Sequence, residues 1–374
     1  MDAILLIIEF IADIFFYAVG KDTKEGSSKR RSIKSSIDKR RIKKATEIIE
    51  NGGLVAFPTE TVYGLGADAF DARAVERIYT AKGRPGDNPL ILHVAKTEQF
   101  FELADDIPTY AKMLANKFWP GPLTLITKKK PSLPGWVGGH PNNSTNTIGV
   151  RIPNHPVALA FLEAVGGPVA APSANKSGRP SPTNAKHVRD DFSDSGEVDM
   201  ILDGGGNAPE VGIESTVVDI TGDAPVILRP GSITRAMIQS VTGREPGNVK
   251  TDGVPRSPGT KYRHYAPNAP MMILRGTPKN IAAYLSNESF EADEKIGLLI
   301  SETTKALLPK NRNTKIIFLD GDMNLAAQKL FANLRQFDKL DVSKIYAEAI
   351  PSAGIGIAIM DRMLKAAEGN VIDV

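Results

Sequence analysis

The sequence predicts an α/β protein with two domains. Short apolar runs of strand length alternate with helical patterns along most of the 374 residues, a length that suits two domains. In the first part, the last strands come in quick succession, which indicates a mixed, twisted sheet. From residue 269 onward strands and helices alternate regularly, which indicates a smaller, Rossmann-like domain with a parallel sheet flanked by helices. The Pro- and Gly-rich residues 246–268 separate the two patterns, so we expect domains at 37–245 and 269–374.

Residues 1–36 are expected to form an atypical extension. An apolar run at 4–19 is interrupted by Glu9 and Asp13, which lie four residues apart and therefore on one helical face. This pattern predicts an amphipathic helix rather than a membrane span, so membrane association is the less favoured interpretation. A signal anchor, because basic residues follow, and an overlong gene model are the alternatives. Residues 26–36 are serine-rich and basic and indicate a flexible linker, either solvated or in weak contact with tRNA.

The bulk composition excludes several classes of function. A net charge of +3 gives no argument for a nucleic-acid binder by itself. The absence of cysteine excludes disulfides, a thiol nucleophile and thiolate metal sites, and it fits a reducing, cytoplasmic location. The five histidines are scattered without zinc-like spacing.

The stretch from Gly53 to Gly66 is the centre of the first domain. It follows a helix that begins near Ile37 and ends at residues 51–53. Residues 54–57 indicate a buried strand, which then gives way to a loop of hydroxyls, a carboxylate and glycines. Such strand-to-loop junctions are where α/β proteins place ligands.

A second helix follows this loop, from an N-cap at Asp71 to Gly83, and it brings Lys82 and Arg84 to its end. Further strands are expected at 90–94, 123–128, 147–152, 169–171, 200–202, 215–220 and 226–228, and in the second domain at 272–274, 296–300, 315–319 and 344–347, with a helix at 325–334. The segment Gly354-Ile355-Gly356 is only a fragment of a dinucleotide-binding fingerprint. A role in packing at the start of a helix is the preferred interpretation.

Most of these strands carry one or two polar residues near an end. Two signatures stand out, Lys82-Gly83-Arg84 and Ser173-Ala174-Asn175. Together with residues 147–153, 215–219 and 228–231 they resemble the YrdC/Sua family, the threonylcarbamoyl-AMP synthases of tRNA modification. The resemblance spans residues 37–374 and implies a YrdC-like first domain. It also implies a nucleotidyltransferase that makes threonylcarbamoyl-AMP and pyrophosphate from L-threonine, bicarbonate or CO2, and ATP.

The family motifs also imply the site residues. The threonine pocket would use Thr61, His93, Arg151, Ser215 and the backbone near Ala171. The ATP site would use Lys82, Arg84, Asn88, Thr147, Ser173, Asn175, Ser181 and Arg229. Lys82 and Arg84 would act catalytically by neutralising the phosphates, and the linker residues Tyr262, His264 and Tyr265 would form a lid over the site.

The residues themselves support an anionic substrate. No P-loop is present, so ATP must be held another way, and three cations from distant segments, Lys82, Arg84 and Arg229, suit a triphosphate. No carboxylate cluster indicates a metal site on protein side chains, so Mg²⁺ is expected to arrive on the ATP phosphates. A downstream threonylcarbamoyl-transferase complex is the implied partner.

Two other functions remain open. An RNA-binding module of the same fold without synthase activity would explain the basic N-terminal segment but not Arg151 and Ser215. A carbamoyl-transfer enzyme that shares the domain is disfavoured, because proteins that resemble that type carry zinc-finger cysteines and this chain has none.

Overall fold

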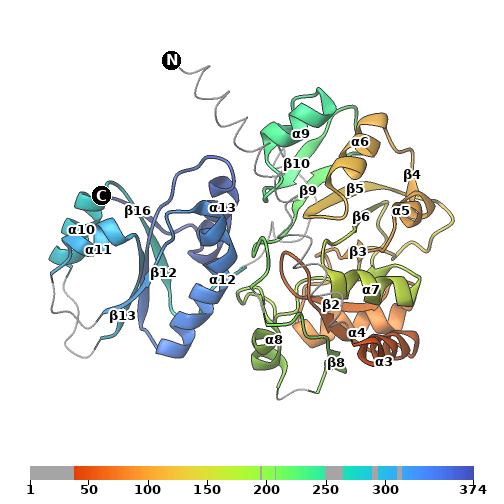
Figure 1. The fold of residues 1–374 in the computed structure, drawn as a ribbon, viewed down its shortest axis with the longest axis horizontal. Helices are drawn as coiled ribbons and strands as arrows, with labels where there is room; N and C mark the ends of the chain where they lie inside the picture. Colours follow the sequence, from red (N-terminus) through yellow and green to blue (C-terminus); the bar gives the residue numbers. More distant parts are fainter. Residues whose placement is uncertain (1–37, 194–195, 207, 249–263, 289–293, 310–313) are drawn as a thin grey trace.

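The computed structural model describes residues 38–193, 196–206, 208–248, 264–288, 294–309 and 314–374. The apolar run and basic linker expected at 1–36 lie outside the described residues. No helix in the described ranges is long and apolar enough to cross a membrane. The described residues form two separate sheets, each with its own helices (Figure 1).

The first sheet has eleven strands in the order β11-β10-β9-β5-β6-β3-β7-β2-β1-β8, with β4 paired to β5. It mixes parallel pairs, such as β3 with β6 and β5 with β9, with antiparallel pairs, such as β5 with β6. The expected mixed sheet is therefore confirmed. Its strands are β1 (Val55–Phe57), β2 (Gly64–Asp68), β3 (Ile91–His93), β4 (Ala104–Asp105), β5 (Leu123–Lys129), β6 (Thr147–Arg151), β7 (Val169–Ala170), β8 (Met200–Ile201), β9 (Thr216–Asp219), β10 (Val226–Arg229) and β11 (Gly247–Asn248).

Two helices of this domain begin at aspartate residues that cap them. In α4 the Asp71 side chain accepts hydrogen bonds from the backbone N–H groups of Arg73 and Ala74, and Gly83 ends the helix with a φ of 59°. The first described helix likewise begins directly after Asp38, whose side chain accepts hydrogen bonds from the backbone N–H groups of Arg40 and Arg41. The helices are α3 (Lys39–Glu50), α4 (Ala72–Lys82), α5 (Thr97–Leu103), α6 (Thr109–Phe118), α7 (Pro156–Val165), α8 (Ala185–Phe192) and α9 (Arg235–Thr242).

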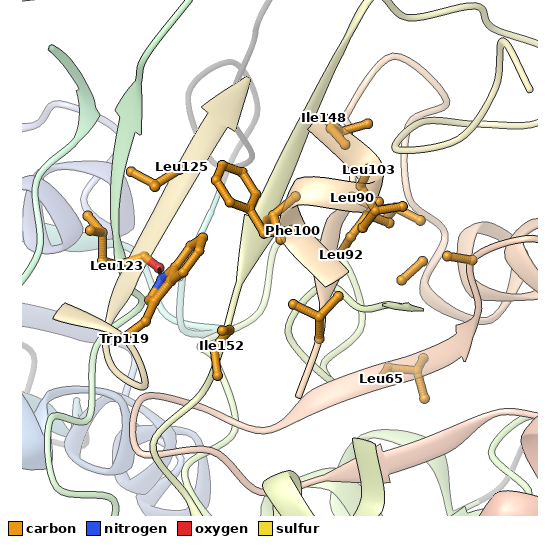
Figure 2. Packing of buried hydrophobic residues seen from close by; sticks show 14 of the residues in the cluster. Leu65, Leu90, Leu92, Phe100, Leu103, Trp119, Leu123, Leu125, Ile148 and Ile152 are labelled. Atoms are coloured by element: carbon orange, nitrogen blue, oxygen red, sulfur yellow. Dashed lines mark hydrogen bonds between the residues drawn. The ribbon is translucent and has the colours of Figure 1, made fainter. Parts of the chain in front are cut away.

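Apolar side chains from the central strands form the main core. Figure 2 shows leucine and isoleucine side chains gathered around the rings of Phe100 and Trp119. The two rings meet edge to face with centroids 5.1 Å apart, and the Trp119 indole N–H donates to the Leu123 carbonyl oxygen at 2.7 Å. This packing fixes the strands whose ends carry the polar residues.

Strand β2 was not expected from the sequence, because the stretch after residue 57, as far as Gly66, was assigned to a loop. Its residues pair antiparallel with β1, with Phe57 opposite Gly64. Glycine is required here by packing: a Cβ atom on Gly66 would lie 2.7 Å from Val169 Cγ1 and 3.0 Å from the Phe57 ring. Residues 58–63 therefore form a tight connection between two central strands.

The C-terminal domain has a five-stranded sheet in the order β14-β13-β15-β12-β16, and every pair is parallel, as predicted. At Gly356 a Cβ atom would lie 2.2 Å from the Pro351 carbonyl oxygen, which agrees with a packing role at the start of α13. The elements are β12 (Met271–Arg275), β13 (Ile296–Ile300), β14 (Thr314–Phe318), β15 (Lys344–Glu348), β16 (Val371–Asp373), α10 (Pro278–Asn287), α11 (Glu302–Leu307), α12 (Met323–Leu340) and α13 (Gly356–Ala366).

Helices α12 and α13 lie on the side of the C-terminal domain that faces the larger sheet (Figure 1). Arg335 of α12 forms a buried ion pair with Asp191, with a closest distance of 2.7 Å. Gly212 packs so closely against α12 that a Cβ atom there would lie 2.3 Å from the Gln328 Cα atom. The two domains are therefore joined by close packing and buried charge.

Candidate active site

The polar ends of several strands surround a cavity in the first domain that is open to solvent. The β1–β2 connection, β3, β6 and the segments after β7 and before β9 all contribute to its wall. The lining residues that were predicted from sequence are Thr61, Arg84, His93, Arg151, Ala171, Ser173, Asn175, Ser215, Arg229, His264 and Tyr265. All five residues expected to bind threonine are thus brought together with four of those expected to bind ATP.

Arg151, at the end of β6, is fixed by three groups in the wall. Its Nη1 donates to Thr61 Oγ1 at 2.8 Å and its Nε to the Gly121 carbonyl oxygen at 3.3 Å. Its Nη2 lies 2.8 Å from Glu60 Oε1, and both side chains are almost wholly buried. Neither Glu60 carboxylate oxygen forms an aligned hydrogen bond with a described residue, so the arginine is its main source of stabilisation.

His93, at the end of β3, stays neutral in this wall. Burial, and then the nearby charge of Arg151, lower its pKa from 6.5 to about 3. The ring Nδ1 lies 3.2 Å from the Ile91 carbonyl oxygen, which favours the tautomer with the proton on Nδ1. The other ring nitrogen, Nε2, is then a hydrogen-bond acceptor.

Arg84 follows the αL cap of α4 and its guanidinium is held in one orientation. Its Nη2 donates to Asn88 Oδ1 and to the Pro89 carbonyl oxygen, both at 2.7 Å, and its Nε donates to the Asn88 carbonyl oxygen at 3.1 Å. Burial lowers its pKa to about 10, which leaves it charged at neutral pH. Asn88 is therefore placed behind Arg84 and does not line the cavity.

Lys82 also lies behind the cavity wall and not in it. Its buried Nζ donates to the backbone carbonyl oxygens of Ser173 and Asn175. Burial lowers its pKa well below the usual value. The structure thus joins the two sequence signatures into one unit, in which Lys82 supports the loop and Arg84 faces the cavity.

Arg229, the last residue of β10, lies beside Ser215, which directly precedes the adjacent strand β9. Arg229 Nη2 donates to the Ser215 carbonyl oxygen at 3.0 Å and to its Oγ at 3.2 Å. Thr124 Oγ1 lies 2.8 Å from Ser215 Oγ, which completes a buried hydroxyl pair. The serine hydroxyl is thereby oriented between a strand hydroxyl and a cation.

Besides Lys82 and Asn88, the predicted residues Ser181 and Thr147 do not line the cavity. Ser181 is fully buried and its Oγ donates to Glu214 Oε1 at 2.5 Å. Thr147 is half-buried at the start of β6, where its backbone N–H donates to Thr145 Oγ1 at 3.3 Å. Tyr262 lies outside the described residues.

Sequence reasoning missed two buried carboxylates at the site. Glu60 stands within the central stretch and Glu214 directly precedes Ser215, so a charged residue beside a buried strand was the available signal. Glu214 lines the cavity and is paired with Arg362, which comes from α13 in the C-terminal domain.

The lining as a whole favours anions. It contains four arginines, at 84, 151, 179 and 229, of which Arg151 is paired with Glu60 and Arg179 with Asp338. Its one carboxylate, Glu214, is paired with Arg362. No group of three or more His, Cys, Asp or Glu side chains that could hold a metal ion occurs among the described residues. The cavity can therefore neutralise a carboxylate and several phosphate oxygens at once.

Comparison with known proteins gives two matching family models. One, described as "Telomere recombination", matches residues 47–231, and the other, described as "Threonylcarbamoyl-AMP synthase, C-terminal domain", matches residues 233–368. The first covers strands β1 to β10 and most of the cavity lining, and the second covers α9, the linker and nearly all of the C-terminal domain.

Relatives and solved structures match over most of the chain. The threonylcarbamoyl-AMP synthase of Pyrococcus abyssi is 41% identical over 92% of this chain and 98% of its own length. That of Bacillus subtilis is 43% identical over 88% of this chain and 94% of its own length. The crystal structure of P. abyssi Sua5 complexed with L-threonine matches with a TM-score of 0.79 and 40% identity, over 90% of this chain and 97% of the other.

Proposed function

Because this chain belongs to the threonylcarbamoyl-AMP synthase family, we propose how its cavity performs the reaction of that family. The enzyme is a nucleotidyltransferase that makes threonylcarbamoyl-AMP from L-threonine, bicarbonate or CO2, and ATP, with release of pyrophosphate. The observation that carries the residue assignment is the convergence of four arginines and the predicted threonine residues on one cavity.

The threonine end of the cavity lies around Arg151. Its guanidinium, held by Thr61 and Glu60, is placed to grip the substrate carboxylate. The neutral His93 can accept a hydrogen bond from the substrate amine or hydroxyl through Nε2. Ser215 and the backbone at Ala171 complete this end.

The nucleotide end lies around Arg84 and Arg229. Both guanidinium groups line the cavity together with Ser173 and Asn175, so charge on the phosphate oxygens is neutralised from two sides. The predicted ATP residues Lys82, Asn88 and Ser181 act from behind this wall, through bonds to the loop of Ser173 and Asn175, to Arg84 and to Glu214 respectively. Thr147 lies at the start of β6, the strand that ends at Arg151. Mg²⁺ would enter as part of the ATP substrate.

The chemistry needs no covalent enzyme nucleophile. The threonine amine attacks CO2 and loses a proton, which gives a carbamate. A carbamate oxygen then attacks the α-phosphorus of ATP, the bond from that phosphorus to the bridging oxygen breaks, and pyrophosphate leaves. Positioning and charge neutralisation carry most of the catalysis.

The linker acts as a lid over this reaction. His264 and Tyr265 line the cavity, and the Tyr265 ring is buried against Phe331 of α12, with ring centroids 5.1 Å apart. The Ala266 N–H donates to the Gly178 carbonyl oxygen at 2.9 Å, which ties the end of the linker to the first domain. A lid protects the mixed anhydride from water, so shortening the linker should lower the product yield while threonine binding stays measurable. An unchanged yield would remove the lid from the mechanism.

The product would be used in the cytoplasm by a threonylcarbamoyl-transferase complex that modifies tRNA. A reactive anhydride must be consumed close to where it is made, which favours direct delivery to that complex. We also propose that the basic N-terminal segment makes weak contact with tRNA.

The deciding experiment measures pyrophosphate release from ATP by the purified protein, with and without L-threonine and bicarbonate. We expect release to require both and to collapse in Arg84→Ala. The exposed Arg73, on the same helix, provides a matched control, and Arg73→Ala should retain activity. If ATP is untouched in every combination and the protein binds RNA in a salt-dependent way, the alternative of an RNA-binding module is correct.

A further inference from the structure

We propose that Arg362, which the C-terminal domain supplies from α13, is a positioning residue for the nucleotide site. It cancels the charge of Glu214 in the cavity wall, so that the ATP phosphates meet a net cationic surface. This inference rests on the proposed function, because it takes ATP as the ligand of the cavity. It assigns the C-terminal domain a direct part in the reaction of the first domain.

Arg362 crosses from one domain into the wall of the other. Its side chain is fully buried, and its Nε donates to Glu214 Oε2 at 3.0 Å. Its Nη1 donates to the Pro230 carbonyl oxygen at 2.7 Å, next to Arg229 in the chain. The ring of Tyr265 lies 5.9 Å from its guanidinium carbon. The arginine therefore touches the cavity wall at the carboxylate, at the segment after β10 and at the linker.

Glu214 lies at the centre of this arrangement. Its Oε1 accepts a hydrogen bond from Ser181 Oγ at 2.5 Å, while its Oε2 accepts from Arg362. Burial by itself raises the pKa of Glu214, but the charges of Arg362 and Arg229 hold it below the ordinary value, so the group stays ionised. An ionised carboxylate thus lines a cavity that has to accept phosphates.

Without Arg362 this carboxylate would oppose the substrate. Like charges repel strongly where burial lowers the effective dielectric constant, and the triphosphate carries several negative charges. Glu214 would then also offset part of the positive charge of Arg229. With Arg362 in place, Glu214 has a counter-charge. Arg362 also pairs with Asp361 at 2.8 Å, and Lys365 pairs with Asp361 at 2.8 Å, so this cluster of two cations and two anions is neutral and Arg84 and Arg229 act on the phosphates.

A different explanation is that Arg362 only holds the domains together. The pair Arg335–Asp191 tests this explanation, because it also joins the domains, is equally buried and has a closest distance of 2.7 Å. Neither of its members lines the cavity. An effect that comes from domain contact should appear in both pairs, whereas an effect on phosphate binding should appear only at Arg362.

The test uses the full chain with three variants of the pair, Arg362→Met, Arg362→Lys and the double variant Arg362→Met/Glu214→Gln, with Arg335→Met as control. Pyrophosphate release gives KM for ATP and for L-threonine, and calorimetry gives ATP binding separately. We expect Arg362→Met to raise KM for ATP about tenfold and KM for L-threonine less than about twofold. Adding Glu214→Gln should restore KM for ATP to within about threefold of the original chain, and Arg362→Lys should retain most ATP affinity.

The inference is overturned if Glu214→Gln fails to restore ATP affinity, or if Arg335→Met raises KM for ATP as much as Arg362→Met does. Should Arg362→Met not fold, the double variant still decides, because it removes the arginine and the carboxylate charge together: an ATP affinity more than about threefold below that of the original chain overturns the inference. Calorimetry separates the two proposals: if the original chain releases no pyrophosphate but its ATP affinity depends on the pair as stated, the synthase assignment fails and the role of Arg362 stands.

Discussion

Replacement of Arg151 by methionine should destabilise the protein strongly, because it leaves Glu60 buried without a counter-charge. The arginine side chain is 5% exposed and the glutamate 3%, and no described residue makes an aligned hydrogen bond to the Glu60 oxygens. Removing one partner of such a pair typically costs about 3–5 kcal/mol. For a domain of this size we expect a fall in Tm on the order of 10 °C.

The second substitution separates stability from binding. In Arg151→Met/Glu60→Gln the buried charge is gone, so most of the lost stability should return. Binding of L-threonine should not return, because the group that grips its carboxylate is still missing. Differential scanning fluorimetry with and without L-threonine measures both effects on the same samples.

An exposed pair provides the control. Lys128 and Asp106 form an ion pair at 2.9 Å with side chains 49% and 74% exposed, so Lys128→Met should leave Tm nearly unchanged. If Arg151→Met melts as the original chain does, or if Glu60→Gln gives no recovery, the reasoning from a buried uncompensated carboxylate is refuted.

Three further outcomes follow from the geometry. Gly212→Ala should separate the domains and lower Tm, because φ at this position is 77° and the new Cβ would lie 2.3 Å from Gln328 Cα; an unchanged melting curve would contradict this close approach. His93 has a folded pKa of about 3, so the unfolded chain binds a proton that the folded chain does not between about pH 3 and 6.5. Stability is therefore lost as pH falls through this window, by up to about 1.4 kcal/mol per pH unit, and urea titrations of His93→Gln should show a flatter dependence. Asn88→Ala releases the guanidinium of Arg84 from its Oδ1 acceptor, and should raise KM for ATP several-fold while the helix content in circular dichroism stays the same.

Local chemistry explains why much of the fold could be predicted. The bounds of α4 follow from Asp71 and Gly83, whose capping roles depend only on their neighbours in the chain. The strands of the C-terminal domain are apolar runs separated by helical patterns, and β13 was predicted with its observed bounds. Strand β2 was missed because its glycines are required by close packing against Phe57 and Val169. These contacts come from other strands and cannot be read from the sequence of residues 64–68.

The candidate site likewise has residues that could be predicted from the sequence and contacts that could not. Residues that stand in motifs, such as Arg84 and Arg151, were named from the sequence and lie in the cavity wall. The pairing of Glu214 with Arg362 could not be predicted, because the two residues are 148 positions apart and belong to different domains. The linker residue Tyr265 was named, but its position between α12 and the cavity became visible only in three dimensions.

The hydrogen bonds from the buried Lys82 amine to two backbone carbonyl oxygens affect the protonation of this lysine when an anion binds. The acceptors are neutral, no described carboxylate lies within ion-pair distance, and burial lowers the pKa of the amine well below its usual value. An anion that approaches this lysine stabilises its protonated form and so raises that pKa. Nucleotide binding beside this loop would therefore favour the protonated lysine, and proton uptake on binding would appear as a dependence of the binding enthalpy on the ionisation heat of the buffer.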